Sequence, residues 1–267
     1  MNQVSSFRAF KTVVAMSWRA SLRERVFSVV GVLASLLLGA SFFFQSFEFG
    51  TDPQGFLADF SFGLILIFGS ILAVMLPGYR WFAEMDGKLC LPVLSRAVNR
   101  GTYFVGQWFG LAGVLAVFVV AMNSVLAVIL LWQSDGAQGV ASLFLGLFEA
   151  SLLQVARLWI IASFVFFLGS FARGNLFVVT LAFVFVFSGQ IMPTAAAYEG
   201  VPSGMPVIVW QSVLLLVPNL GAFGLDGADV LAGDGFGNSG SLLGYSLLYV
   251  TAYLSLGAWT FSKRELA

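Results

Sequence analysis

The sequence predicts an all-α integral membrane protein with six transmembrane helices, and three observations support this fold class. Hydrophobic residues make up 59% of the 267 residues and charged residues only 10%, and the mean hydropathy of +0.94 lies outside the range of soluble domains. Six apolar runs reach the length of about 20 residues that crosses roughly 30 Å of hydrocarbon. The third observation is the placement of lysine and arginine. The runs cover residues 27–47, 57–77, 104–132, 141–171, 175–197 and 241–261.

Basic residues occur only in alternate connections between these runs. The first, third and fifth connections, at 48–56, 133–140 and 198–240, contain neither lysine nor arginine. Every basic residue except Arg157 lies in the second or fourth connection or in one of the two terminal segments. Because basic loops remain in the cytoplasm, we expect both termini to be cytoplasmic. The whole chain, 1–267, is expected to form one transmembrane domain.

The segment before the first run, 5–25, has the pattern of an amphipathic helix. Its apolar residues recur at spacings of three and four, and basic residues occupy other positions. Such a helix is suited to lie along the inner leaflet, in contact with membrane lipids. A docking surface for a cytoplasmic partner is the alternative, and the two roles are compatible. The apolar positions are Phe7, Phe10, Val14, Ala15, Trp18 and Leu22.

The second connection, 78–103, is much longer than the 2–8 residues that joining two helices requires. Gly87 is expected to end a first short helix, and Pro92 to open a second one. The sequence therefore predicts a short, mixed-charge helix pair that projects at the cytoplasmic surface. A solvated hairpin is the alternative.

Two ionisable residues fall inside the fourth run. A charge at bilayer depth is unfavourable by roughly 2.5–3.5 kcal/mol, so Glu149 and Arg157 should face protein or water, with Gln154 between them. They are eight positions apart, which corresponds to about 80° of rotation on a helix, so we expect each to have another partner. Arg157 either has a structural partner or lines a transport path. Asn123 and Gln190 are weaker candidates, each explained by a hydrogen bond between helices.

The positions of small residues predict close helix packing, and the positions of prolines predict a short helix that does not span the membrane. Gly106 and Gly110 open the third run, and the small-residue set Ser142, Gly146 and Ala150 opens the fourth; such stripes allow close helix approach within the chain or at a dimer seam. The apolar stretch 205–220 is bounded by prolines to a length too short to span. It is expected to form a re-entrant or interfacial helix.

Several kinds of chemistry are excluded or disfavoured. The chain has no histidine and one cysteine, Cys90, so histidine-based catalysis, histidine metal sites and intrachain disulfides do not apply. No GxxxxGK[ST] phosphate loop is present, and the Gly/Asp-rich segment at 224–240 lacks the order of a calcium loop. We expect no enzyme activity, no catalytic residue, no metal and no cofactor in this chain.

The second connection also carries a family resemblance. The order Glu84, Gly87, Leu89-x-Leu91-Pro92, Ser95-Arg96, then Tyr103 and Gly106 resembles the permeases of ABC type-2 exporters, and most closely the branch associated with nitrous oxide reductase and multicopper enzyme maturation. The elbow helix at 5–25 and the ending 261–266 are also similar. The resemblance implies that 78–103 is a coupling helix that docks on a separate ATPase subunit. The residues it assigns to docking are Glu84, Asp86, Gly87, Leu91, Pro92, Arg96 and Arg100.

The function implied by the resemblance is the permease subunit of an ATP-driven exporter in a bacterial inner membrane. Its partners would be an ABC ATPase that binds ATP and Mg²⁺, a second permease copy or paralogue, and a periplasmic accessory protein, with no nucleic acid involved. An ATPase-linked scaffold that acts mechanically on a periplasmic protein is one alternative. An ion-coupled secondary transporter is the other. The sequence does not specify a substrate.

Overall fold

A computed structural model of the chain describes residues 3–41, 53–87, 99–133, 140–197, 217–224, 227–232 and 239–263. Within these ranges the chain forms helices and no strands. The α-helices are α1 (Gln3–Leu22), α2 (Arg25–Ser41), α3 (Pro53–Asp86), α5 (Arg100–Gln133), α6 (Val140–Phe171), α7 (Asn175–Ala197), α9 (Gly227–Ala232) and α10 (Ser239–Lys263), and η2 (Gly221–Phe223) is a 3₁₀ turn. The predicted all-α class is therefore confirmed.

Five of these helices are long and apolar enough to cross a membrane, namely α3, α5, α6, α7 and α10. They correspond to the second to sixth predicted runs. The first run, 27–47, is represented by α2, which has 17 residues and falls in the class of shorter apolar helices; the rest of that run lies outside the described residues. The count of six spans therefore stays a prediction.

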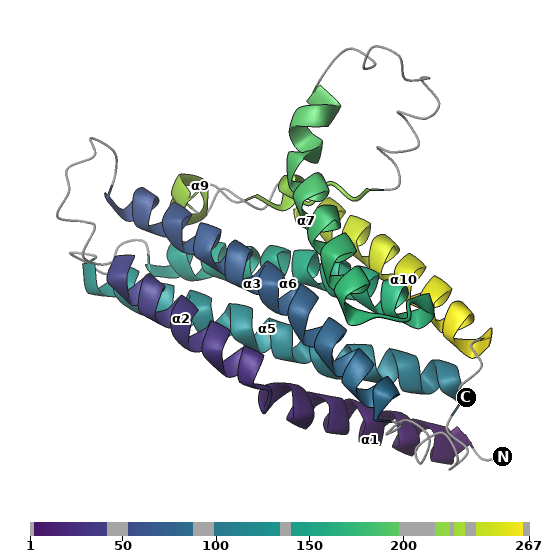
Figure 1. The fold of residues 1–267 in the computed structure, drawn as a ribbon. Coiled ribbons are helices and arrows are strands. Elements are labelled where there is room, and N and C mark those ends of the chain that lie inside the picture. Colours follow the sequence, from purple (N-terminus) through teal and green to yellow (C-terminus); the bar gives the residue numbers. More distant parts are fainter. Residues whose placement is uncertain are drawn as a thin grey trace.

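Helices α2, α3, α5 and α6 lie side by side, while α7 crosses them steeply and α10 lies beside α6 and α5 (Figure 1). Helix α6 is the central element. Of its most apolar stretch 78% is buried, against 22% for α10, and it contacts α3, α5, α7, α9 and α10. Consecutive long helices run in opposite directions, so their ends meet in two groups.

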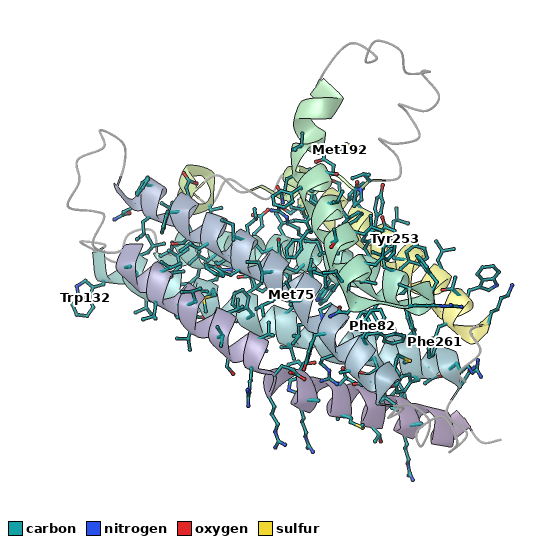
Figure 2. All side chains as sticks on the ribbon, viewed as in Figure 1. Met75, Phe82, Trp132, Met192, Tyr253 and Phe261 are labelled. Atoms are coloured by element: carbon teal, nitrogen blue, oxygen red, sulfur yellow. The ribbon has the colours of Figure 1, made fainter. Side chains whose placement is uncertain are left out.

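Aromatic rings pack where α3 ends, α5 begins, and α6 and α10 end. The Trp81 ring makes edge contacts with Phe104, Phe166 and Phe261 at centroid distances of 5.4, 5.5 and 5.2 Å, and its Nε1–H donates to the Gly169 carbonyl. Figure 2 shows Phe82 and Phe261 at this end, and Trp132, which is 84% exposed, at the other. Edge-to-face rings and a satisfied indole N–H make this a well-specified junction of four helices.

We call this end of the bundle the basic end, because Arg100, Arg173 and Lys263 lie at the ends of the helices that meet there. Helix α1 also begins here and α10 ends here (Figure 1). The opposite end carries Asp59 and Glu149, in the outer parts of α3 and α6. For these five residues the partition of charge in the sequence is also a partition in space.

Helix α3 is longer than the sequence indicated, which corrects the prediction of a loop over 78–103. It continues through Pro77 to Asp86, so residues 78–86 belong to the same helix as the second run and form no separate short helix. Proline removes one backbone donor, but neighbouring helices cover this stretch: a Cβ atom at Gly78 would lie 3.1 Å from Oδ1 of Asn175. Gly87 does end the helix, as expected, with its N–H donating to the Ala83 carbonyl.

Helix α1 runs along the side of α5, and not across the end of the bundle as an interfacial elbow would. Gly106 faces Phe10 and Val13, Gly110 faces Val14 and Ser17, and Gly113 faces Trp18. These contacts advance along both helices in the same direction, so the two helices are parallel. The apolar face of α1 therefore packs on protein, while Phe7 and Met16 remain exposed. The glycine stripe at 106 and 110 serves packing within the chain.

Short segments cover the end opposite the basic end. Helix α9 packs against α3 and α6, and a Cβ atom at Gly146 would overlap the Val230 carbonyl, so this second small-residue stripe also serves packing within the chain. The Gly227 N–H donates to Asp59 Oδ1 at 2.5 Å. Of the predicted re-entrant segment 205–220, only 217–220 is described, and it is not helical. The rest of that prediction lies outside the described residues.

Candidate functional site

A cavity of about 240 Å³ lies between α3 and α6, below the 3₁₀ turn η2. Its lining is apolar except for three residues: Asp59 on α3, and Gln154 and Arg157 on α6. We call it the Arg157 cavity. The apolar part of its lining consists of Phe62, Gly63, Ile65, Leu66, Leu158, Phe223 and Gly224.

Arg157 is 4% exposed and has no partner sufficient for its charge. Its Nε and Nη2 atoms are buried and have no hydrogen-bond partner among the described residues. Within the same residues the one carboxylate–guanidinium ion pair is that between Arg80 and Glu84, so no described acidic side chain neutralises Arg157. A buried charge left in this state is strongly unfavourable.

The two unpaired nitrogens are adjacent on the guanidinium plane. The Nε–H and one Nη2–H bond point the same way along one edge of the group, about as far apart as the two oxygens of a carboxylate or a phosphate. This edge is a preferred receptor for such groups, because it forms two parallel charge-assisted hydrogen bonds. In this structure both nitrogens are covered by the protein, so this edge is unpaired among the described residues and is not open to the cavity.

Gln154, one turn before Arg157, is held by the neighbouring helix α5. Asn123 Nδ2 donates to Gln154 Oε1 at 2.9 Å and to Ser151 Oγ at 3.0 Å. The Asn123 side chain is buried, and its Oδ1 has no described partner. The predicted hydrogen bond between helices is thus present for Asn123. It orients Gln154 in the wall of the Arg157 cavity.

Asp59 supplies the acidic part of the lining at the exposed side of the cavity. The residue is exposed, and its Oδ1 accepts the hydrogen bond from the first residue of α9. The cavity lining therefore includes an exposed carboxylate, from Asp59 on α3, and a buried arginine, Arg157 on α6. Nothing in the sequence connects Asp59 with Arg157, because the two lie almost a hundred residues apart on helices whose pairing only the fold defines.

Glu149 and Gln190 lie elsewhere. Glu149 is 4% exposed, and its carboxylate accepts a hydrogen bond from the Ser239 hydroxyl at the start of α10. Glu149 and Arg157 do not form an ion pair, which agrees with their predicted rotation on the helix. Gln190 on α7 has a buried Nε2 without a described partner and does not line the Arg157 cavity.

A second polar group, the basic-end cluster, joins α1, α3 and α5. Glu84 accepts hydrogen bonds from Arg80 Nη2 at 2.5 Å, Tyr103 Oη at 2.6 Å and Gln107 Nε2 at 2.7 Å. Arg80 Nη1 in turn donates to the Ser17 carbonyl and to Ser21 Oγ of α1. The side chains of Arg80 and Glu84 are only 10% and 13% exposed. The spacing of Arg80 and Glu84, i and i+4 with opposite charges, was the sequence signal for this pair.

The carboxylate of Glu84 is thus engaged by three donors of its own chain, and its expected role in docking stays a prediction. Among the other docking candidates, Asp86 is the last residue of α3 and Gly87 follows it. Arg100 opens α5, and its Nη1 donates to the Ser262 carbonyl at 3.2 Å. Leu91, Pro92 and Arg96 lie outside the described residues.

An open groove of about 1180 Å³ lies along the second half of α1 and the start of α2. Four of its lining residues are basic, and Tyr79 of α3 borders it. The Arg157 cavity is smaller and lies between two long helices, and its lining includes a buried arginine that no described acidic side chain pairs with. The basic residues of the groove are Lys11, Arg19, Arg23 and Arg25.

Neither cavity nor cluster can be assigned by comparison with known proteins. No protein-family model matches the chain, and no curated protein sequence matches it. The resemblance to ABC type-2 permeases rests on the sequence features given above.

Proposed function

We propose that this chain is the transmembrane permease subunit of an ATP-binding-cassette exporter, and that a separate subunit binds and hydrolyses ATP. The observation that carries the transport part is the Arg157 cavity, a largely apolar recess lined by a buried cation inside a bundle of apolar helices. An intramembrane ionisable residue that faces a cavity is by default a functional candidate. The ATPase part rests on the family resemblance and on the lack of any phosphate-binding loop in the chain.

The proposed contact with the ATPase lies between α3 and α5. The connection is shorter than 78–103, because α3 ends at Asp86 and α5 begins at Arg100. The docking candidates remain Glu84, Asp86, Gly87, Leu91, Pro92, Arg96 and Arg100, and the Glu84 carboxylate is also bonded within the chain. Nucleotide-driven closure of two ATPase domains would push on this connection and shift the helices between two states.

The experiment that tests this proposal is purification of the tagged chain from its native membrane in mild detergent. We expect an ATP-hydrolysing subunit and a second permease copy or paralogue to co-purify. Arg96→Ala should lower recovery of the ATPase about tenfold, as expected for loss of a charged interface contact. The control is Arg173→Ala, which removes an exposed charge outside both the α3–α5 connection and α1.

Three other outcomes have defined meanings. Transport driven by an ion gradient, with no ATPase in the preparation, would replace the proposal by a secondary transporter. An ATPase together with a periplasmic protein bound to 198–240, and no solute-stimulated hydrolysis, would replace it by a mechanical scaffold. Normal ATPase recovery with Arg96→Ala and Asp86→Ala together would reject the docking site.

A further inference from the structure

We propose that the open groove along α1 and α2 binds one anionic phospholipid, with the lipid phosphate among the basic residues of α1 and one acyl chain along α2. We call this groove the basic groove. The site lies on the outside of the bundle, and lipid binding there requires neither an ATPase nor a second permease copy. The inference therefore goes beyond the proposed function and rests only on the insertion of the chain in a membrane.

The basic groove carries an excess of positive charge that the chain does not neutralise. Four basic residues line it, all of them exposed, and Glu24 is the one acidic residue of the described lining. Within the described part of the chain the ion pair between Arg80 and Glu84 involves none of the four. Basic residues at a membrane surface attract anionic lipid headgroups, and guanidinium groups bind phosphate through charge-assisted hydrogen bonds. The four basic residues are Lys11, Arg19, Arg23 and Arg25.

The basic groove lies at the depth expected for phospholipid headgroups. The apolar run of α2 begins at residue 27, two positions after Arg25, and the apolar run of α3 ends at residue 77, two positions before Tyr79. Arg25 and Tyr79 both border the groove, and α2 and α3 pack against each other. Two neighbouring helices therefore place the groove at the same boundary of the hydrocarbon. Tyr79 is 52% exposed, which is typical of an aromatic side chain at a membrane–water interface.

A second groove continues along α2 and has the character of an acyl-chain site. This α2 groove measures about 510 Å³ and extends from Phe27 to Leu36, whereas the lining of the basic groove reaches Val26 on the same helix. The hydroxyl of Ser35 donates to the Gly31 carbonyl at 2.8 Å, so this polar side chain is satisfied without water. The lining residues are Phe27, Ser28, Gly31, Val32, Ser35 and Leu36.

The length of the α2 groove agrees with the thickness of one lipid leaflet. Nine helical steps from Phe27 to Leu36 correspond to about 14 Å, which is about half of the roughly 30 Å hydrocarbon core. The α2 groove thus begins where the headgroup region ends and follows α2 toward the middle of the bilayer. Figure 1 shows α1 and α2 following one another along the same side of the bundle.

The two grooves together favour a phospholipid over other anions. A free phosphate would occupy the basic groove alone, and an acidic segment of a cytoplasmic protein would not enter a groove at hydrocarbon depth. A zwitterionic lipid would bring its own cation next to the basic side chains. A lipid with a net negative headgroup avoids that repulsion and fills both grooves with one molecule.

The test uses the purified full chain in a neutral detergent and counts bound lipids by native mass spectrometry. The chain is titrated with phosphatidylglycerol, or with phosphatidylcholine that has the same acyl chains. We expect one phosphatidylglycerol to bind saturably, with an affinity about tenfold or more above that for phosphatidylcholine. A third titration adds glycerol 3-phosphate as a competitor, which should displace little of the bound lipid because it lacks an acyl chain.

Two substitutions test the headgroup part of the site. Arg19→Gln combined with Arg23→Gln should lower the affinity for phosphatidylglycerol about tenfold or more, because each basic residue near the membrane surface contributes about fivefold to the binding of an anionic lipid. The affinity for phosphatidylcholine should change much less. The control is Arg173→Gln, which removes an exposed charge outside both grooves and should leave both affinities unchanged.

A glycine pair on α2 tests the acyl-chain part of the site. Gly31 lines the α2 groove and Gly39 does not, and a Cβ atom at either position would meet no heavy atom within 4 Å. Both helical positions therefore accept a larger side chain, and replacing a helical glycine favours the helix. Gly31→Leu should lower the affinity for phosphatidylglycerol about fivefold or more by filling the groove, and Gly39→Leu should not.

Four results would overturn the proposal. Equal affinity of the unaltered chain for the two lipids would remove the selectivity for anionic headgroups. Complete displacement by glycerol 3-phosphate would assign the basic groove to a free phosphate. Unchanged phosphatidylglycerol binding in the double arginine variant, together with reduced recovery of an ATPase from native membranes, would assign it to a cytoplasmic protein. Equal lipid affinities of Gly31→Leu and Gly39→Leu would exclude the acyl chain from the α2 groove.

The outcome of this test is independent of the permease proposal. The titrations contain no ATPase, so a failure of lipid binding leaves the permease proposal intact. Absence of an ATPase from the membrane purification would likewise leave the lipid site intact.

Discussion

Glu84 is the residue on which three helices converge. One carboxylate oxygen receives Arg80, and the other receives Tyr103 and Gln107. Arg80 Nη1 donates to the Ser17 carbonyl and to Ser21 Oγ, and these two hydrogen bonds connect the cluster to α1. A buried network of this kind stabilises a fold when every member is satisfied, and it becomes strongly unfavourable when one acceptor is removed.

Glu84→Ala should therefore destabilise the protein and not merely weaken docking of a partner. Removing the carboxylate leaves a buried guanidinium and two neutral donors without acceptors, and we expect a loss of about 1–3 kcal/mol or more. The measurement is the melting temperature in detergent together with the yield of monodisperse protein.

The matched control is Glu24→Ala, which removes the same charge at the junction of α1 and α2, where Glu24 is only partly buried. It should melt like the unaltered chain. Glu84→Gln should retain part of the stability, because its amide oxygen still accepts from Arg80. Equal stability of Glu84→Ala and Glu24→Ala would refute the structural role of the cluster.

At the scale of the element, α1 and α5 form one unit because glycine is placed at every point of close approach. A Cβ atom at Gly110 would lie 2.5 Å from Cβ of Ser17 and 2.7 Å from the Val14 carbonyl oxygen. Backbone atoms cannot move aside as the tip of a flexible side chain can. Small residues at such positions let two helices approach closely, and here they bring Ser17 within reach of the Gln107 carbonyl at 2.9 Å.

Gly110→Ala should separate α1 from α5, while Gly101→Ala should not. Both substitutions raise helix propensity by about 1 kcal/mol, but a Cβ atom at Gly101 meets no heavy atom within 4 Å. We expect Gly101→Ala to be neutral or slightly stabilising and Gly110→Ala to lower the melting temperature. Trypsin cleavage after Arg19 or Arg23 should also become faster in Gly110→Ala, because α1 then detaches more often.

A shift of the same sign and size for both alanine variants would contradict this packing. It would mean that α1 leaves α5 readily, as expected of a helix whose main contacts are with lipid.

At the scale of the whole molecule, the chain is polarised along the axis of the bundle. Arg100, Arg173 and Lys263 mark the basic end, and Asp59 and Glu149 lie toward the opposite end. Positive charge is retained on the cytoplasmic side during insertion. The polarity of the fold therefore predicts that the basic end faces the cytoplasm and that the Arg157 cavity, which extends from Asp59 inward, faces the outer half of the membrane.

Cysteine labelling of intact cells tests this orientation. In a Cys90→Ser background, cysteines at Asp135 and Asp229 should react with a membrane-impermeant thiol reagent from outside, and cysteines at Ser95 and Ser262 should not. All four should react after permeabilisation. External labelling of Ser262 would require an odd number of spans between it and a cytoplasmic N-terminus, and the six-span prediction would then be wrong.

The sequence by itself determined where most of the long helices lie. It also identified Arg157 as the one basic residue inside an apolar run. The predicted runs 141–171 and 175–197 match α6 and α7 almost residue for residue, because hydropathy, a terminating Arg173-Gly174 pair and the length of a span are local properties of the chain. Arg157 was identified for the same reason, since a lone basic residue in an apolar run needs no tertiary information to be noticed.

Only the tertiary structure decided which faces meet. Helical periodicity predicts that α1 has an apolar face, but it does not state whether that face meets lipid or Gly106 and Gly110 of α5. It does not state whether Glu84 points to solvent or to Tyr103, nor that Asp59 shares a cavity with Arg157. These outcomes depend on contacts between residues far apart in the chain, and their free energy arises only when the helices pack.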